Sequence, residues 1–479
     1  MTGSLLLSPF LTISTLGEVP NERGTPDEPV EIVQRDWTVA TSQQTSQRID
    51  VSANVLMSGD RPQTPLAEPH LAINPKDANH LVVASIVAGF RGVALFVSFD
   101  GGDSWQSVRL KGLHDLTGFG DPWVTFDQKG IVYLVGLGRP SNALVWRSGD
   151  GGLTWSQPTA IPGRAFDHTS ITVDGRGMIY VFASQSVRRD DGTVGHPVIV
   201  ARSTDGGVSF EDPLALSPTN LKYQAGMPAV LRDGSVAFSY FDFATERTTS
   251  RNLRTRRIWF ARLAENGQRF SLPAFVGEVT DFRNGFSPFA VDTSPTSPFT
   301  GRLYVASANL DSLDQGVHVN ELDASFLLDT EVGVLLNYSK DNGVTWSRPH
   351  LVAQGFAEAW RVNLAVNPQG VIALAWMQRT DEADVGFEPY VTVSVDGGIT
   401  FVQAVRVSDT KSVLDSRVPG NIFEGFDVAR RWPAGGDYFG LASDDDGVFH
   451  IVWADSRTGV FQLWSAKITV KKSQRFRSR

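Results

Sequence analysis

The chain of 479 residues has no cysteine, no excess of positive charge and no long apolar run. Without cysteine it can form neither a disulfide nor a thiolate nucleophile. Its formal net charge of −9 argues against a nucleic-acid partner and against binding to anionic lipid. No run reaches the length of a transmembrane helix. Zinc motifs, phosphate loops and serine nucleophile elbows are absent too, so we expect no metal and no cofactor.

The two ends of the chain differ from the middle. Residues 1–48 are polar and rich in proline, glutamine and threonine, which predicts a flexible extension. Within them, residues 5–13 (LLLSPFLTI) form one short apolar stretch without a preceding lysine or arginine. It is a poor signal peptide, and the sequence leaves a secreted or periplasmic location open. Residues 471–479 form a basic tail.

What the chain does contain is one phrase repeated five times, Ser-x-Asp-Gly-Gly-x-Ser/Thr-Trp/Phe with small variations. Its glycines permit a positive φ, its aspartate can accept backbone hydrogen bonds across a turn, and its ring can pack between neighbouring units. A phrase recurring about every fifty residues or more predicts a repeat architecture. The copies are Ser98–Trp105, Ser148–Trp155, Ser203–Phe210, Ser339–Trp346 and Ser394–Phe401, with an eroded sixth at Leu263–Phe270.

Short alternating strands surround each copy and repeat as a four-stranded unit. The seventh unit has no fourth strand of its own, and the unassigned segment Ile49–Met57 can supply it. The sequence therefore predicts an all-β, seven-bladed β-propeller over residues 49–470, closed by an N-terminal strand and monomeric; six blades is the alternative count. The units begin near Glu68, Asp121, Asp167, Gly226, Phe286, Trp360 and Asp437.

The repeated phrase resembles the Asp-box, or BNR repeat, of the sialidase superfamily. Gly120–Asp127 and Gly436–Asp444 are also similar to phrases in bacterial proteins labelled exo-alpha-sialidase-like. Sialidases bind the substrate carboxylate with three arginines and use a tyrosine nucleophile with an aspartate acid/base. The resemblance would cast Arg361 and Arg457 as carboxylate ligands, Tyr438 as nucleophile, and Asp121 or Asp167 as acid.

The starts of the inner strands and the loops between second and third strands should share one face of a propeller, where ligands usually bind. Carboxylates and histidines suit general acid–base catalysis, and arginines suit anionic groups. The predicted catalytic residues are Asp121, Asp167, His168, Arg361, Asp437 and Tyr438. The predicted substrate-binding residues are Glu68, His70, Arg91, Arg139, Asp455 and Arg457.

Three functions remain open on these residues. The first is a sialidase-like glycoside hydrolase acting on extracellular glycans with a carboxylate pair. The second is a lyase that cleaves a uronate-containing polysaccharide, with His70, His168 and Tyr438 as proton carriers and Arg361 as the stabilising cation. The third is a propeller that binds a glycan or a protein without catalysis.

Overall fold

The computed structural model divides the chain into two units, Met1–Asp36 and Trp37–Arg479, and only the second contains described residues. The structure describes residues 38–39, 47–110, 119–138, 142–188, 192–216, 222–247, 254–263, 269–281, 286–311, 331–355, 359–379, 386–412, 422–423 and 426–472.

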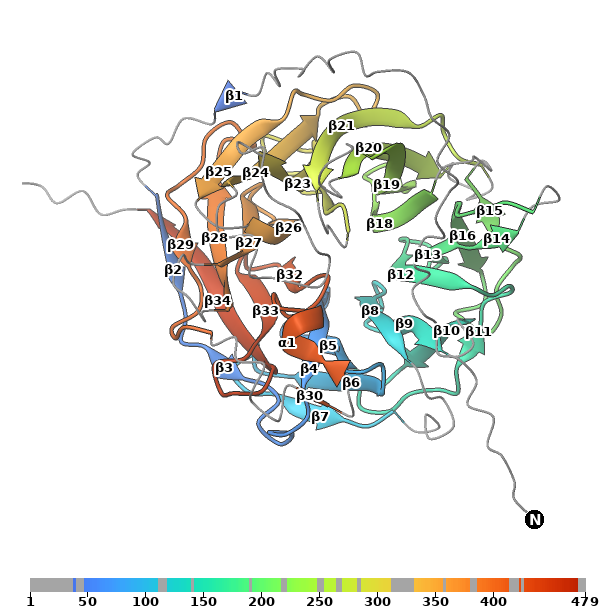
Figure 1. Ribbon diagram of the computed structural model, residues 1–479, viewed down its shortest axis with the longest axis horizontal. Helices are drawn as coiled ribbons and strands as arrows, with labels where there is room; N and C mark the ends of the chain where they lie inside the picture. The colour runs from blue at the N-terminus through green and yellow to red at the C-terminus, as the bar shows by residue number, and fades with distance from the viewer. Residues whose placement is uncertain are drawn as a thin grey trace, which may run out of the picture. The chain divides into compact units, whose positions relative to one another are not determined.

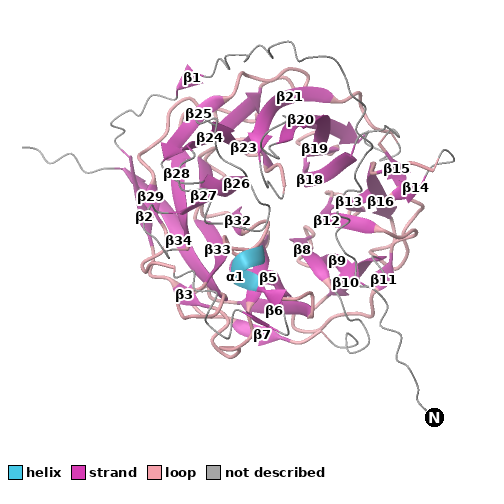
Figure 2. Ribbon diagram, in the orientation of Figure 1, coloured by secondary structure: helices cyan, strands magenta, loops and turns pink. Residues whose placement is uncertain are grey.

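Seven small antiparallel sheets follow one another around a ring (Figure 1). Strands dominate the described ranges, and the helix α1 (Val428–Arg431) is a single turn (Figure 2). Within each blade the strands run outward in sequence order from an innermost first strand, and strands from the N-terminal part of the chain are added at the outer edge of two sheets. The prediction of a seven-bladed propeller is confirmed. Among the described residues no helix is long and apolar enough to cross a membrane.

The first four blades each consist of four strands in sequence order. Blade one is β4 (Leu66–Asn74), β5 (Asp77–Val87), β6 (Gly92–Ser98) and β7 (Gln106–Val108). Blade two is β8 (Gly120–Phe126), β9 (Val132–Gly138), β10 (Asn142–Ser148) and β11 (Thr159–Ala160). Blade three is β12 (Phe166–Val173), β13 (Ile179–Gln185), β16 (Val198–Ser203) and β17 (Leu214–Ala215), with a hairpin of β14 (Val187–Arg188) and β15 (Val194–Gly195). Blade four is β18 (Lys222–Val230), β19 (Val236–Arg247), β20 (Arg254–Leu263) and β21 (Ala274–Asp281).

Blades five to seven contain strands and a helix in addition to the four-strand arrangement. Blade five is β22 (Phe289–Val291), β23 (Leu303–Asp311), β24 (Glu331–Ser339) and β25 (His350–Gly355), with β1 (Thr38–Val39) parallel to β25. Blade six is β26 (Ala359–Val366), β27 (Ile372–Arg379), β28 (Phe387–Ser394) and β29 (Val405–Arg406). The short pair β30 (Ile422–Phe423) and β31 (Phe426–Asp427) then leads to α1. Blade seven begins with β32 (Gly440–Ser443), β33 (Phe449–Asp455) and β34 (Gln462–Lys472).

The N-terminal part of the ring completes blade seven. Strand β2 (Gln47–Val51) pairs antiparallel with β34, with Gln47 opposite Lys472 and Val51 opposite Ile468. Strand β3 (Val55–Leu56) pairs with the start of β34. The predicted closing segment is confirmed and begins two residues earlier than expected. The division into extension, propeller and tail stays a prediction, since β1 and the first residues of β2 fall before residue 49 and residues 473–479 lie outside the described ranges.

The five repeated turns connect third and fourth strands and share one set of hydrogen bonds. In the second copy Ser148 Oγ donates to Asp150 Oδ1 at 2.7 Å, and the backbone N–H of Thr154 donates to the same oxygen at 2.8 Å. Gly151 and Gly152 take left-handed φ values of 81° and 92°. His80, near the β4–β5 turn of blade one, contacts the carbonyl of Gly151 at 2.8 Å. These turns therefore lie at the end of the ring opposite the starts of the inner strands.

The apolar core lies between blades. One cluster combines side chains of β5 and β6 with side chains of β8, β9 and β10, and another combines β27 and β28 with β33 and β34. Because each sheet buries one face against each neighbour, no blade has a core of its own. The starts of the inner strands, including the candidate site residues, are thus fixed by contacts on both sides. The eroded sixth copy of the turn includes residues 264–268, which lie outside the described ranges.

Candidate functional site

A β-bulge at the start of the inner strand positions one polar side chain in each of four blades. The bulged residues are not glycines, yet they take left-handed φ values: 55° at Glu68, 47° at Asp121, 53° at His168 and 53° at Arg361. The strand register shifts at each of these places. A non-glycine residue in this conformation costs about 1–3 kcal/mol, and such strain and such bulges concentrate beside active sites.

Aromatic rings from three blades meet across the channel. Trp123 of blade two, Phe286 before blade five and Tyr438 of blade seven have ring centroids 5.2–5.7 Å apart. None of the three is more than 8% exposed. His70 stacks on the outer face of Trp123 at 3.6 Å. We call the three contacting rings of Trp123, Phe286 and Tyr438 the aromatic floor.

Asp121, Asp167 and His168 gather at the blade-two and blade-three side of the channel. The backbone N–H of His168 donates to Asp121 Oδ2 at 2.9 Å, and His168 Nδ1 lies 3.1 Å from Asp167 Oδ2. One side-chain ligand atom from each of the three residues lies within 4.8 Å of the other two. The ring of His168 also contacts Phe286 edge-on at 5.6 Å, so this cluster borders the aromatic floor.

Arg361, Asp437 and Glu68 form a second group on the side of blades six, seven and one. Arg361 donates to Asp437 Oδ1 at 2.6 Å and to the carbonyl of Gly436 at 2.7 Å. The backbone N–H of Asp437 donates to Glu68 Oε1 at 2.9 Å. Glu68 and Arg361 are 2% and 3% exposed. This group is internally paired, and it holds the chain just before Tyr438 in place.

The environment moves the pKa values of neighbouring carboxyl groups in opposite directions. Burial and the nearby charge of Asp167 raise the pKa of Asp121 to about 6. Burial would also raise the pKa of Asp167, but the charge and hydrogen bonds of His168 outweigh it and lower that pKa. Burial with the charges of Asp437 and Asp121 raises the pKa of Glu68 well above its usual value. Near pH 5, Asp121 is a proton donor beside an ionised Asp167.

His168, His70 and Tyr438 each keep a single protonation state at neutral pH. Burial opposes the charge of His168, yet the attraction of Asp167 and Asp121 raises its pKa to about 10. Burial lowers the pKa of His70 to about 3. Burial and the charge of Glu68 raise the pKa of Tyr438 well above 10, and its hydroxyl donates to the carbonyl of Pro122 at 3.1 Å. At neutral pH His168 is a cation, His70 is neutral and Tyr438 is a phenol.

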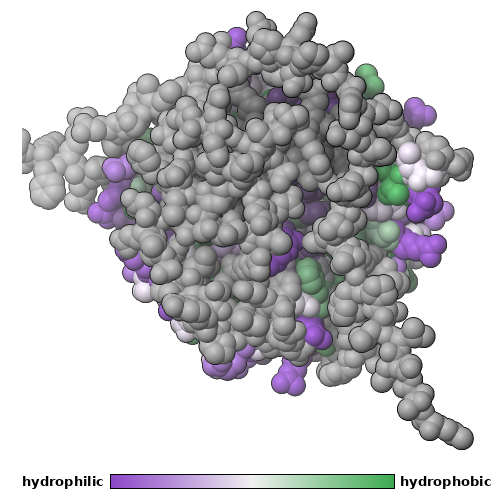
Figure 3. All heavy atoms as spheres, viewed as in Figure 1, coloured by the Kyte–Doolittle hydropathy of each residue, from purple (hydrophilic) through white to green (hydrophobic). Residues whose placement is uncertain are grey.

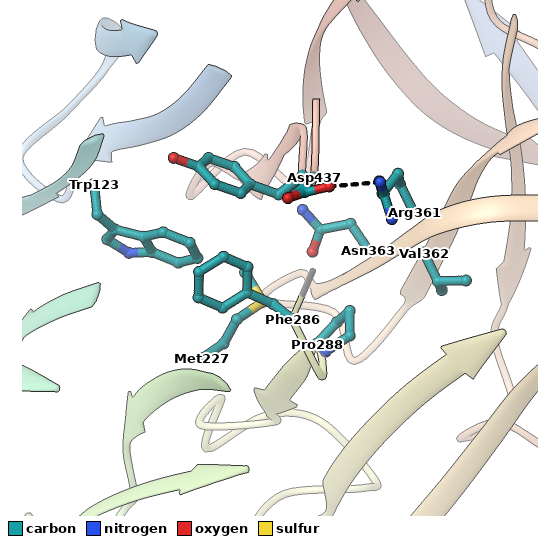
Figure 4. Close-up of a pocket in the computed structure, with 9 residues that line it drawn as sticks. Trp123, Met227, Phe286, Pro288, Arg361, Val362, Asn363 and Asp437 are labelled. Carbon is teal, nitrogen blue, oxygen red and sulfur yellow. Dashed lines mark hydrogen bonds and ion pairs between the residues drawn. The ribbon is translucent and has the colours of Figure 1, made fainter. Parts of the chain in front are cut away.

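A pocket opens beside the aromatic floor (Figure 4). Its space, including the part open to solvent, is about 270 Å³. Arg361 and Asp437 form its polar side, and the Trp123 and Phe286 rings face them across the opening. Ligand pockets commonly combine apolar walls with a few such polar groups. The lining is completed by Met227, Pro288, Val362, Asn363 and Tyr438.

The structure brings the six predicted catalytic residues to one end of the channel, together with Glu68 and His70. Asp455 and Arg457 have different neighbours, at the seam between blades six and seven. Arg457, whose side chain is 4% exposed, contacts Asp455 at 2.7 Å, Asp409 at 2.6 Å and Asn54 at 2.9 Å. Its guanidinium also lies over the Trp464 ring at 4.3 Å. Arg91 is exposed between β5 and β6, and Arg139 lies outside the described residues.

Sequence reasoning missed the aromatic floor and His196. Trp123 and Phe286 read as ordinary core residues of inner strands, and only the convergence of three blades places them together. His196 lies next to β15, and its charge helps to lower the pKa of Asp167 after the larger effect of His168. Asp121, Asp167 and His168 are also close enough together to hold a divalent cation between carboxylate and imidazole ligands. No cofactor-binding motif accompanies them in the sequence.

No family model matches the chain, and comparison with curated proteins gives no match either. Solved structures do resemble it. An ulvan lyase of a new polysaccharide lyase family is 13% identical, with 86% of this chain and 94% of that chain covered and a TM-score of 0.51. A protein of unknown function from Dyadobacter fermentans is 12% identical over 88% and 99%, with a TM-score of 0.47. The α-L-arabinofuranosidase Arb93A of Fusarium graminearum is 13% identical over 73% and 92%, with a TM-score of 0.42. At these identities the likeness extends to the propeller fold.

Proposed function

We propose that this chain is a glycoside hydrolase that uses Asp121 as general acid and Asp167 as its ionised partner. The observation that carries the proposal is the pair itself: two carboxyl groups beside each other whose pKa values are displaced in opposite directions. Glycoside hydrolysis needs one protonated and one ionised carboxyl group on either side of the bond. That the ulvan lyase of similar fold acts on a polysaccharide is consistent with a glycan substrate.

In this mechanism Asp121 donates its proton to the glycosidic oxygen as the bond to the anomeric carbon breaks. His168 fixes both carboxylates, accepting neither proton, because it stays protonated. Carboxylate oxygens within 4.8 Å suit the retaining geometry, in which the groups stand about 5–5.5 Å apart, better than the inverting one. Asp167 would then attack the anomeric carbon, and water would release the sugar with Asp121 acting as base.

The sialidase version of this proposal assigns the attack to Tyr438. Its buried hydroxyl, its hydrogen bond to Pro122 and its raised pKa weaken it as a nucleophile, so we assign the attack to Asp167. Sialosides remain a substrate to be tested. A lyase needs an unprotonated base near the substrate C–H bond, and protonated His168 and the Tyr438 phenol supply none at neutral pH. His70 is unprotonated, but it stacks on Trp123 and its pKa of about 3 makes it a weak base. Hydrolysis is therefore favoured over elimination.

The test is a panel of sialosides, arabinan, ulvan and neutral glycans, assayed both for new reducing ends and for ultraviolet absorbance of unsaturated products. We expect reducing ends without the absorbance, and a loss of at least about 10²-fold in turnover for Asp121→Asn and for Asp167→Asn. Asp103→Asn, in a repeated turn at the opposite end of the ring, is the matched control and should be fully active. Unsaturated products would establish a lyase, and thermal protection by a glycan without any product would establish a binding protein.

A further inference from the structure

The β14–β15 hairpin extends from blade three at the end of the ring where the candidate site lies. It occupies the connection between second and third strands, with Val187 opposite Gly195 and Arg188 opposite Val194. Its tip, residues 189–191, lies outside the described ranges. Where Figure 1 places β14 and β15, Figure 3 shows hydrophobic and hydrophilic side chains side by side on the surface. Val187 and Val194 are 39% and 45% exposed.

Strand register connects this hairpin to Asp167. Asp167 pairs with Ser184 across β12 and β13, and the hydroxyl of Ser186 contacts His196 Nδ1 at 3.1 Å. Side chains two residues apart on a strand share a face, and directly opposed residues share it too. Ser186, His196 and Arg188 therefore lie along one face of the hairpin. The hairpin meets the strand of Asp167 through the backbone N–H of Ser186, which donates to the carbonyl of Ala165 at 2.9 Å. The electrostatic effect of His196 on Asp167 agrees with this placement.

The side chains on this face suit an acidic sugar. Arg188 is exposed and His196 half-buried, so both can reach a bound molecule. A guanidinium binds a carboxylate or a sulfate through paired hydrogen bonds. Val194 lies opposite Arg188 and therefore on the same face, where it can cover the C–H face of a sugar ring.

We propose that the β14–β15 hairpin forms a subsite for an anionic group, a carboxylate or a sulfate ester, on the sugar unit next to the bond that is cleaved. Arg188 binds the anion directly, and His196 supports it from the neighbouring strand. This inference rests on the proposed function, since it places the subsite beside Asp167. If the subsite exists, the substrate is an acidic polysaccharide and Arg188 contributes to specificity for it.

Binding by the full-length Asp121→Asn protein tests the subsite without turnover. The probes are two matched pairs, dextran sulfate with dextran, and oligogalacturonate with its carboxyl-reduced form, titrated by calorimetry at low and physiological salt. We expect one charged probe to bind at least about tenfold more tightly than its neutral partner. Whether the sulfated or the carboxylated pair shows the difference identifies the anion.

Arg188→Gln, alone and with His196→Gln, should remove that preference and leave the neutral probes unaffected. Arg232→Gln, an exposed arginine in the β18–β19 turn at the opposite end, is the matched control and should keep it. Because Arg188 is exposed, its single variant remains informative if the double variant melts lower. Equal affinity for charged and neutral probes, or a preference that survives Arg188→Gln, would overturn the subsite. An active Asp121→Asn protein would overturn the proposed hydrolase while leaving the binding result intact.

Discussion

At the scale of residues, the site depends on where protons reside. Asp121 and Asp167 are chemically identical side chains, and they differ because Asp121 is more buried and Asp167 pairs with the imidazolium of His168. The same pairing keeps His168 charged. The backbone contributes as well, since the left-handed conformations of Asp121 and His168 direct both groups into the channel. Acid–base roles here follow from position and not from residue type.

The raised pKa of Asp121 predicts two effects of pH. If Asp121 is the acid, kcat/KM should fall as pH rises through about 6, and the acid limb should lie below the ordinary aspartate value because the pKa of Asp167 is lowered. The folded state also binds this proton more tightly than the unfolded state. That contribution to stability is complete below the ordinary aspartate pKa of 3.8 and is lost as pH rises through about 6.

Both effects can be measured between pH 3.5 and about 7.5 by activity and by thermal melting. Asp121→Asn should remove the part of the melting-temperature change that falls in this window, whereas Asp103→Asn should follow the unmodified protein. A pH-independent difference in melting temperature between the Asp121→Asn and parent proteins would show that folding does not raise the pKa of Asp121.

At the scale of elements, the repeated turn and the bulge have separate tasks. The turns join third and fourth strands at one end, and the bulges begin the inner strands at the other. The repeat made the blades and their turns predictable, because turn glycines, the aspartate and alternating strands are local signals. The bulges were not predictable, because left-handed aspartate, glutamate, histidine and arginine residues carry no such signal. The aromatic floor needs three blades at once, and of its three residues only Tyr438 was predicted to belong to the site.

Asp150 tests the structural role of the repeated turn. Burial alone would raise its pKa, but hydrogen bonds from Thr154 and Ser148 lower it to about 2. Asp150→Ala should destabilise the fold by about 1–2 kcal/mol, as loss of a comparable capping group does. Urea unfolding and activity assays of the variant check this, with Asp103→Asn as the control in the neighbouring turn. Lost activity at unchanged stability would place function at this end of the ring.

At the scale of the whole molecule, the pairing of β2 and β3 with β34 joins the first and last parts of the described ring. Strand β2 pairs with β34 over five residues, and Arg457 connects Asn54 with Asp409 and Asp455 at the seam between blades six and seven. The sequence predicted the closing strand because blade seven lacked one. It could not show that Arg457, predicted to bind substrate, is enclosed by Asp455 and Trp464.

Two N-terminal truncations distinguish the contribution of the closing strand to stability from that of the residues that precede it. Deletion of residues 1–36 should leave expression and melting temperature nearly unchanged, because the described strands of the ring begin at Thr38. Deletion of residues 1–57 removes β2 and β3 and leaves the outer edge of β34 unpaired, so we expect aggregation or a lower melting temperature. Soluble yield and thermal melting of both truncations check this. Equal behaviour of the two would mean that β2 is dispensable.

The register of the closing pair also has a mechanical consequence. Gln47, where β2 begins, lies opposite Lys472, where β34 ends, so these two residues share one end of the ladder. A force that pulls Gln47 and Lys472 apart would load one hydrogen-bonded pair at a time and not the whole ladder in shear. The ring should therefore open at its closing blade under low tension, and blades one to six should separate only afterwards.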